Sequence, residues 1–134
     1  MSIEAARFDP HRHNVLVVDD FEATRDAIIT MLKTKGMDAV GAQSGPDALD
    51  LFQAGMRPCV VLLDLRMPGM DGWETWERMK ALPDLAETPV VILSADVADD
   101  TRARQVGIRQ FLRKPIDGRE IFAAIQKYCQ QQTP

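Results

Sequence analysis

Apolar residues alternate along the chain between short β-branched runs and longer stretches with helical spacing. Runs rich in Val, Ile and Leu occupy residues 15–18, 60–63 and 90–93, and weaker runs occupy residues 39–42 and 109–112. Continuous apolar runs of this length are typical of strands that are covered on both faces. We therefore expect the three strong runs to be central strands and the two weak runs to lie at the edges of one sheet.

Between and after these runs, apolar residues recur every three or four positions, which predicts amphipathic helices. The stripes are Ala27, Ile28, Met31 and Leu32; Ala48, Leu49 and Phe52; Trp73, Trp76, Met79 and Leu82; and Ile121, Ala124, Ile125 and Tyr128. Gly36 and Gly55 follow the first two stripes, where glycine often ends a helix. A further helix over residues 98–106 has only a thin apolar face.

Five strands that alternate with five helices predict βαβ units, a parallel sheet and helices on both faces of that sheet. With the strong runs at the centre, the fold class is α/β: a single flavodoxin-like, doubly wound (βα)5 domain with strand order 2-1-3-4-5. Such sheets bind ligands beyond the carboxyl ends of the strands, where the winding reverses. That position lies between the first and third strands, beside Asp20 and Asp64.

Composition and charge narrow the function classes. Hydrophobic residues make up 46% and charged residues 27% of the chain, as in ordinary globular domains. The net charge of −4 argues against nucleic-acid binding as the main activity. No apolar stretch has the length of a membrane helix or the pattern of a secretory signal. We therefore expect a cytoplasmic location, no direct nucleic-acid binding and no membrane association.

The two cysteines offer no recognisable site. Cys59 opens a predicted strand and Cys129 lies in the last predicted helix. Their spacing matches no metal or redox motif, which favours buried or incidental thiols.

Acidic side chains follow two of the predicted central strands. Asp19 and Asp20 come directly after the first strand, and Asp64 comes directly after the third. An acidic pair alone is often a helix N-cap, but three carboxylates close together must share protons or a cation. Mg²⁺ suits such a set because it takes a few oxygen ligands and keeps several waters. We expect Asp20, Asp64 and the backbone carbonyl of Arg66 as direct ligands, with Asp19 acting through a water.

A hydroxyl and an amine are expected at the same edge of the sheet. Ser94 follows the fourth strand and Lys114 follows the fifth, although alone they would be a helix cap and a surface lysine. Beside the carboxylates, the hydroxyl could donate to a phosphoryl oxygen and the ammonium could attract it. A carboxylate can become an aspartyl phosphate when a metal and hydrogen-bond donors neutralise the incoming phosphoryl oxygens. Asp64 is the candidate acceptor, because it follows the central strand, with the other acids on one side and Ser94 and Lys114 on the other. The sequence leaves the peptide bond between Lys114 and Pro115 open as cis or trans.

Taken in order, these residues resemble the motif of the receiver (CheY-like) domain of two-component response regulators. The matches are the acidic pair Asp19-Asp20, Leu63-Asp64-Leu65 followed by MPGMDG, Ser94-Ala95, and Lys114-Pro115. The resemblance covers residues 14–130, with a flexible N-terminal segment expected at 1–13 and a C-terminal tail at 131–134.

The resemblance implies a signalling function rather than turnover of a separate substrate. Asp64 would accept phosphate, with Mg²⁺ as cofactor, from a sensor histidine kinase or a histidine phosphotransfer protein. The chain would catalyse its own phosphorylation and dephosphorylation, and Ser94 and Phe111 would move together as the switch to the output face. Two departures leave the output details open: Phe111 stands where many relatives carry tyrosine, and Ile108 replaces a common alanine in a slightly shortened segment.

Three alternatives are open on the sequence. An aspartate-nucleophile phosphatase needs a second acid two residues after the nucleophile, where this chain has Arg66, and turnover of a phosphate ester would favour it. A nucleotide-binding domain needs a Gly-rich phosphate loop after a strand, and none follows. A degenerate receiver, acting independently of phosphate, would fail to label with acetyl phosphate. The downstream partner is also open, since the chain could be a stand-alone regulator or the receiver of a larger protein.

Overall fold

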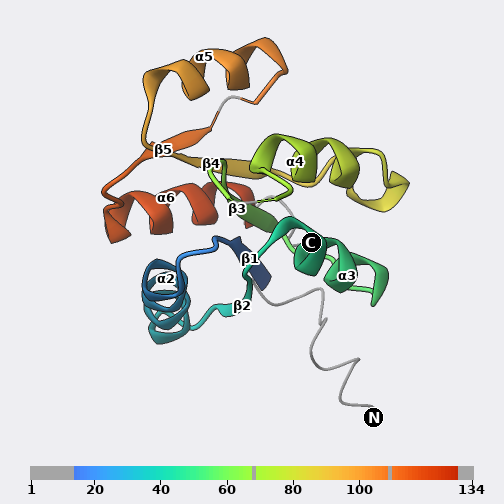
Figure 1. Cartoon of the computed structure of the whole chain (residues 1–134). Helices are drawn as coiled ribbons and strands as arrows, with labels where there is room; N and C mark the ends of the chain where they lie inside the picture. The colour runs from blue at the N-terminus through green and yellow to red at the C-terminus, as the bar shows by residue number, and fades with distance from the viewer. Residues whose placement is uncertain (1–13, 68, 109, 130–134) are drawn as a thin grey trace.

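The computed structural model describes residues 14–67, 69–108 and 110–129, which form a five-stranded parallel sheet with helices on both faces (Figure 1). The strands are β1 (Asn14–Val18), β2 (Asp38–Ala42), β3 (Val60–Asp64), β4 (Val90–Ser94) and β5 (Phe111–Arg113). The helices are α2 (Glu22–Thr34), α3 (Gly45–Gln53), α4 (Gly72–Lys80), the short 3-10 helix η1 (Pro83–Leu85), α5 (Val97–Gln105) and α6 (Gly118–Cys129).

The strands lie in the order β2-β1-β3-β4-β5, and every neighbouring pair is parallel, which confirms the predicted topology. Val18 lies beside Leu63, and Leu63 lies beside Ile92, so the carboxyl ends of β1, β3 and β4 meet at one edge. These three strands are buried along their whole length, as their continuous apolar runs predict. The edge strands β2 and β5 are partly exposed.

Successive side chains of each strand point to opposite faces of the sheet and so divide the core into two layers. Leu16 of β1 packs in the layer that contains Phe52 of α3 and Met79 of α4. Val15 packs in the other layer, together with residues of α2 and α6 such as Leu32 and Ile125. Figure 1 shows the same division, with α2 and α6 on one side of the sheet and α3 and α4 on the other.

The helix ends agree with the sequence pattern. Gly36 and Gly55 follow α2 and α3 with φ angles of 84° and 105°, a backbone region that glycine enters without steric cost. Helix α5 buries only Asp100 and Ala103, which confirms its thin apolar face. The fifth strand lies slightly later than the predicted range 109–112, and Arg109 is outside the described residues.

The cysteine prediction is wrong in one respect. Cys59 is buried as expected, but it is disulfide-bonded rather than a thiol. The chain has one other cysteine, Cys129 at the end of α6, whose side chain is outside the described part of the structure.

The remaining expectations on organisation stay predictions. The segments 1–13 and 131–134 are outside the described residues, so nothing tests their proposed flexibility. Within the described ranges, every helix is too short or too polar to cross a bilayer.

Candidate functional site

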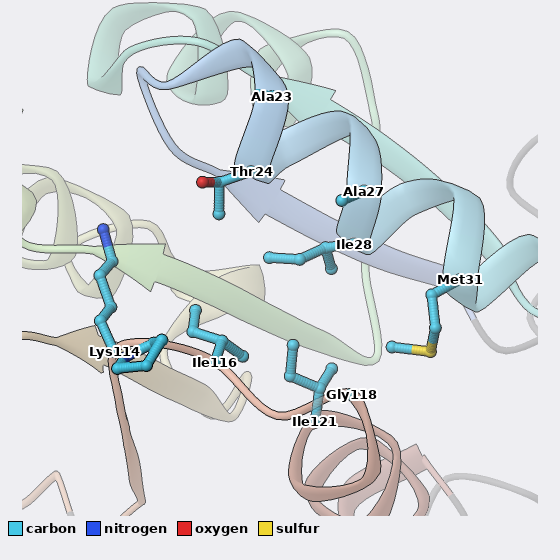
Figure 2. Close-up of a pocket in the computed structure, with 10 residues that line it drawn as sticks. Ala23, Thr24, Ala27, Ile28, Met31, Lys114, Ile116, Gly118 and Ile121 are labelled. Atoms are coloured by element: carbon cyan, nitrogen blue, oxygen red, sulfur yellow. The ribbon is translucent and has the colours of Figure 1, made fainter.

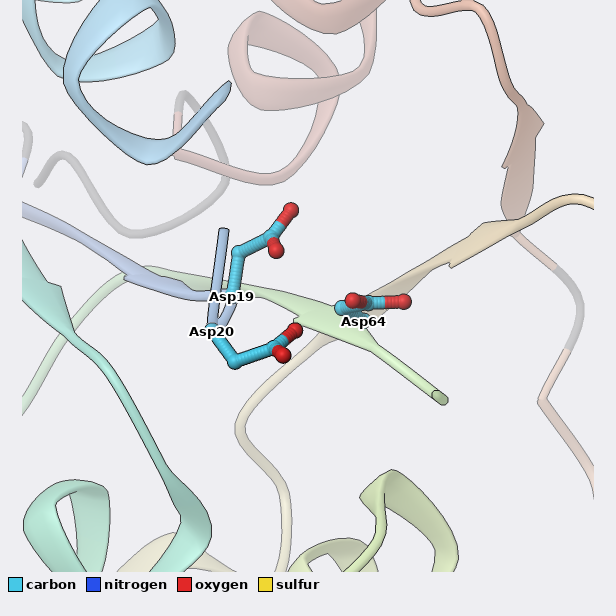
Figure 3. Close-up of side chains that lie close together, drawn as sticks. All are labelled: Asp19, Asp20 and Asp64. Carbon is cyan, nitrogen blue, oxygen red and sulfur yellow. The ribbon is translucent and has the colours of Figure 1, made fainter. Parts of the chain in front are cut away.

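Three carboxylates meet beyond the carboxyl ends of β1 and β3 (Figure 3). Asp19, Asp20 and Asp64 each offer an oxygen, and these oxygens lie within 4.8 Å of one another. Asp19 and Asp64 are buried, whereas Asp20 is exposed to solvent. The parallel register thus brings together the three acids that the sequence singled out.

Local backbone contacts fix Asp19. Its Oδ1 accepts a hydrogen bond of 2.9 Å from the backbone N–H of Phe21, which shapes the turn into α2. Arg25, in the first turns of α2, donates to the backbone carbonyl of Asp19 at 2.8 Å. The other carboxylate oxygen, Oδ2, is buried without a hydrogen-bond partner in the described structure. A buried carboxylate oxygen without a hydrogen bond is costly, so this atom is suited to a cation.

Asp64 ends the central strand and carries an unfavourable charge. Its Oδ1 accepts hydrogen bonds from the backbone N–H of Arg66 and from Lys114 Nζ, both at 3.2 Å. Burial raises the pKa of the Asp64 carboxyl, and the nearby charge of Asp19 raises it further. The Arg66 N–H and the Lys114 ammonium oppose this rise without reversing it. An added dication would favour the ionised form of Asp64.

Lys114 lies between the two buried acids. Its Nζ is 3.2 Å from Asp64 Oδ1 and 3.8 Å from Asp19 Oδ2, and the side chain is 30% exposed. The backbone N–H of Lys114 donates to the carbonyl of Ser94 at 2.8 Å, which joins the ends of β5 and β4. The peptide bond to Pro115, left open by the sequence, is cis.

The Ser94 hydroxyl lies at the same edge but bonds elsewhere. It donates to the Asp96 carbonyl at 2.8 Å and accepts from the Asp96 N–H at 3.2 Å and from Arg113 Nη1 at 3.3 Å. Ser94 is 2% exposed, and its described bonds do not reach Asp64. Phe111 is half-buried, with the Arg104 guanidinium 5.1 Å from the centre of its ring.

Sequence reasoning missed three arginine side chains near the site. Arg25 contacts Asp19, and Arg113 contacts Ser94. Arg66 was considered only for its backbone carbonyl. The Arg66 guanidinium lies 3.3 and 3.4 Å from carboxylate oxygens of Asp96 and Asp99. In the sequence, a single arginine in a helix, a strand or a loop looks like a solvated residue, and only the fold brings it to its partner.

A groove of about 470 Å³ opens beside Lys114, between α2 and the segment that joins β5 to α6 (Figure 2). Its lining is mostly apolar, with Ile28 and Met31 from α2 facing Ile116 and Ile121. The sequence stripes predicted the helix faces but not this space between them.

Fold and site together define the class of protein. It is a doubly wound α/β domain in which an acidic cluster of the metal-binding type and a lysine surround an aspartate on the central strand. The family model for the response regulator receiver domain matches residues 15–126. The chain belongs to this receiver family and therefore to two-component signalling.

Individual relatives agree with the family match. Protein PilG of Pseudomonas aeruginosa is 34% identical over 122 residues, which cover 90% of both chains. Response regulator PleD of Caulobacter vibrioides is 34% identical over 114 residues, 84% of this chain and 25% of PleD.

Solved structures give the same fold. The chemotaxis protein CheY4 of Vibrio cholerae has a TM-score of 0.80 at 25% identity, over 87% of this chain and 98% of CheY4. A response regulator receiver protein from Pseudomonas putida has a TM-score of 0.79 at 30% identity, over 87% and 97% of the two chains.

Membership of the family decides between the general functions that the sequence left open. Receiver domains are typically signal transducers rather than turnover enzymes, and they interact with histidine kinases or phosphotransfer proteins. The phosphatase and nucleotide-binding alternatives are therefore set aside. The family normally uses Mg²⁺, and the cluster of Asp19, Asp20 and Asp64 could bind such an ion.

Proposed function

We propose that Asp64 is the phosphoacceptor of this receiver. The observation that carries the proposal is the position of Lys114, whose ammonium lies between two buried carboxylates and 3.2 Å from Asp64. The hydrogen bonds of Arg66 and Lys114 go to Asp64 Oδ1, and described residues donate none to Oδ2. We assign Oδ2 as the atom that forms the new bond to phosphorus, while the bond from phosphorus to the donor breaks and leaves the electron pair on the histidine nitrogen, or on the acetate oxygen when acetyl phosphate is the donor.

The acidic cluster supports Mg²⁺ as the cofactor. The candidate donors are all oxygens, which hard cations prefer, and Asp19 Oδ2 lacks any other hydrogen-bond partner within the described ranges. Asp20, Asp64 and the backbone carbonyl of Arg66 would hold the ion directly, and Asp19 would act through a water. When bound, the ion would neutralise charge on the phosphoryl oxygens.

The chain's own residues have distinct roles in this proposal. Lys114 attracts the phosphoryl oxygens and Asp64 provides the nucleophile. Ser94 turns to donate its hydroxyl proton to a phosphoryl oxygen once Asp64 is modified. Phe111 fills the space that Ser94 leaves, so that phosphorylation shifts the population between two packings of the output face.

The phosphate donor is proposed to be a sensor histidine kinase or a histidine phosphotransfer protein. A small phosphodonor can replace it because the receiver supplies the groups that act on the phosphoryl. The downstream target, or a fused output domain, is left open.

Labelling with acetyl phosphate tests the proposal directly. The wild-type chain, incubated with acetyl phosphate and Mg²⁺, should gain the mass of one phosphoryl group, and Asp64→Asn should gain none while staying folded. Equal labelling of Asp64→Asn would remove Asp64 from the role. A wild-type chain that does not label would instead favour a degenerate receiver.

A further inference from the structure

Arg113 connects three parts of the molecule beside the proposed acceptor. It is the last residue of β5 and directly precedes Lys114. One arm of its guanidinium, Nη1, donates to Ser94 Oγ at the end of β4, 3.3 Å away. The other arm, Nη2, donates to Asp100 Oδ2 in the first turn of α5. A single planar group therefore bonds both to the Ser94 hydroxyl and to Asp100 of helix α5.

The Ser94 hydroxyl is saturated in this arrangement. A hydroxyl has one proton to donate and two lone pairs. The proton goes to the Asp96 carbonyl, and the lone pairs accept from the Asp96 N–H and from Arg113. To donate to a phosphoryl group on Asp64, Ser94 must give up its bond to the Asp96 carbonyl, and the turn of its Oγ toward Asp64 carries the oxygen away from Arg113 Nη1.

Asp100 is only half satisfied. The residue is 7% exposed, and its Oδ2 is bonded to Arg113, while Oδ1 is buried without a hydrogen-bond partner in the described structure. A guanidinium can bond both oxygens of a carboxylate through two parallel N–H donors. Nη2 bonds to Asp100 already, and Nη1, which would supply the second parallel donor, is held toward Ser94 by its hydrogen bond to the hydroxyl.

We propose that Arg113 is a positioning residue that restrains the Ser94 hydroxyl in the unmodified state and transmits its release to α5 through Asp100. When Ser94 turns toward the phosphoryl group, the guanidinium is no longer held against the hydroxyl and can turn so that Nη1 pairs with Asp100 Oδ1. The single-donor pair becomes a two-donor pair, which draws the first turn of α5 toward the end of β5. This coupling rests on the proposed function of Asp64 and Ser94, and it acts beside the movement of Phe111.

A set of variants separates this role from a purely structural one. Arg113→Ala combined with Asp100→Asn removes the contact without leaving a buried charge unpaired. We expect this variant to label with acetyl phosphate and Mg²⁺ about 2- to 10-fold faster than wild type, the range for loss of one restraining hydrogen bond. In a Ser94→Ala background, the same two changes should alter the rate less than about twofold, because no hydroxyl is left to release.

A second readout follows the helix itself. On addition of beryllofluoride and Mg²⁺, wild type should show altered amide exchange over residues 97–105, and the Arg113→Ala/Asp100→Asn variant should show little change there. Arg113→Lys keeps a cation beside Asp100 but lacks the two-armed guanidinium, so it should also show little change in exchange over residues 97–105. This variant tests the inference if the double variant does not fold. Arg78→Ala, which breaks an exposed pair with Glu74 on α4, should behave as wild type.

The outcomes are distinguishable. If wild type labels but the Arg113 variants match it in rate and in α5 exchange, this inference is overturned and the proposed function stands. Equal rate factors with and without the Ser94 hydroxyl would also overturn it, because Arg113 would then act independently of Ser94. A wild-type chain that does not label overturns both.

Discussion

The ionised form of Asp64 is disfavoured by its surroundings. It is buried, it lies beside Asp19, and both features favour its protonated form. Lys114 and the Arg66 N–H recover only part of that cost. The proposed acceptor is thus held at the expense of stability, which is a common compromise in functional sites.

We expect Asp64→Asn to stabilise the metal-free chain at pH 7 by about 1 kcal/mol. A carboxyl whose pKa is raised in the folded state lowers stability once pH rises through that pKa, and it has no such effect below its ordinary pKa of about 3.9. The gain from the substitution should therefore be present at pH 7 and absent near pH 3.5. Urea unfolding at both pH values measures it, and a loss of stability at pH 7 would contradict the argument.

We expect Asp20→Ala to weaken Mg²⁺ binding by at least about tenfold, as loss of a ligand should exceed the effect of losing an outer contact. Trp73 provides the signal, because it lies at the start of α4, just after the loop that follows Asp64, and is 6% exposed. Its fluorescence is followed during a Mg²⁺ titration. Asp84→Ala removes an exposed acid in η1 and should leave the titration unchanged. An unaltered curve for Asp20→Ala would count against the ligand assignment.

At the scale of elements, α4 meets the end of β3 through Gly72. A Cβ added there would lie 2.5 Å from the backbone oxygen of Asp64 and 2.6 Å from Leu65 Cα. Backbone atoms cannot move aside as a flexible side chain would, so the glycine permits the close approach between the start of α4 and the end of β3.

Gly72→Ala should therefore destabilise the chain by about 1–3 kcal/mol through overpacking and should slow labelling of Asp64. Gly118→Ala is the matched control at the start of α6, where a Cβ would meet Met31 at ordinary contact distances of 3.8 and 3.9 Å. That variant should be neutral or slightly stabilised, since alanine favours the helix. Urea unfolding of both variants tests the contrast, and equal effects would contradict it.

Helix α5 is attached differently from the other helices, because charged contacts replace apolar burial. Arg102 lies 4.5 Å from the ring centre of Trp73, and Arg66 pairs with Asp96 and Asp99 at the start of the helix. Half-exposed ion pairs of this kind are screened by salt.

Amide exchange in residues 97–105 should accordingly rise between about 0.05 and 1 M NaCl, where screening shortens to about 3 Å. Helix α6 buries Ile121 and Ile125 and should change much less over the same range. Exchange followed by mass spectrometry gives both values, and an equal response of the two helices would show that apolar contacts hold α5 as well.

For the molecule as a whole, the sequence predicted what depends on pattern and missed what depends on individual contacts. Continuous apolar runs identified β1, β3 and β4, and strand order then brought the acids and Lys114 to one edge. The contacts of Arg25 and Arg113 were missed because their partners are set by tertiary packing. The disulfide of Cys59 was missed for the same reason, since no local spacing marks it.

The unequal strands of the sheet have a consequence for solubility at high concentration. A sheet edge exposes unpaired N–H and C=O groups that can capture a strand from another molecule. Here the outermost strands are β5, with three residues, and β2, with an acid at its first position and a glycine at its fourth. An incoming chain would find a short template at β5 and, at β2, one that carries an acid and a glycine, so the native protein should resist edge-to-edge aggregation while its central apolar strands stay enclosed.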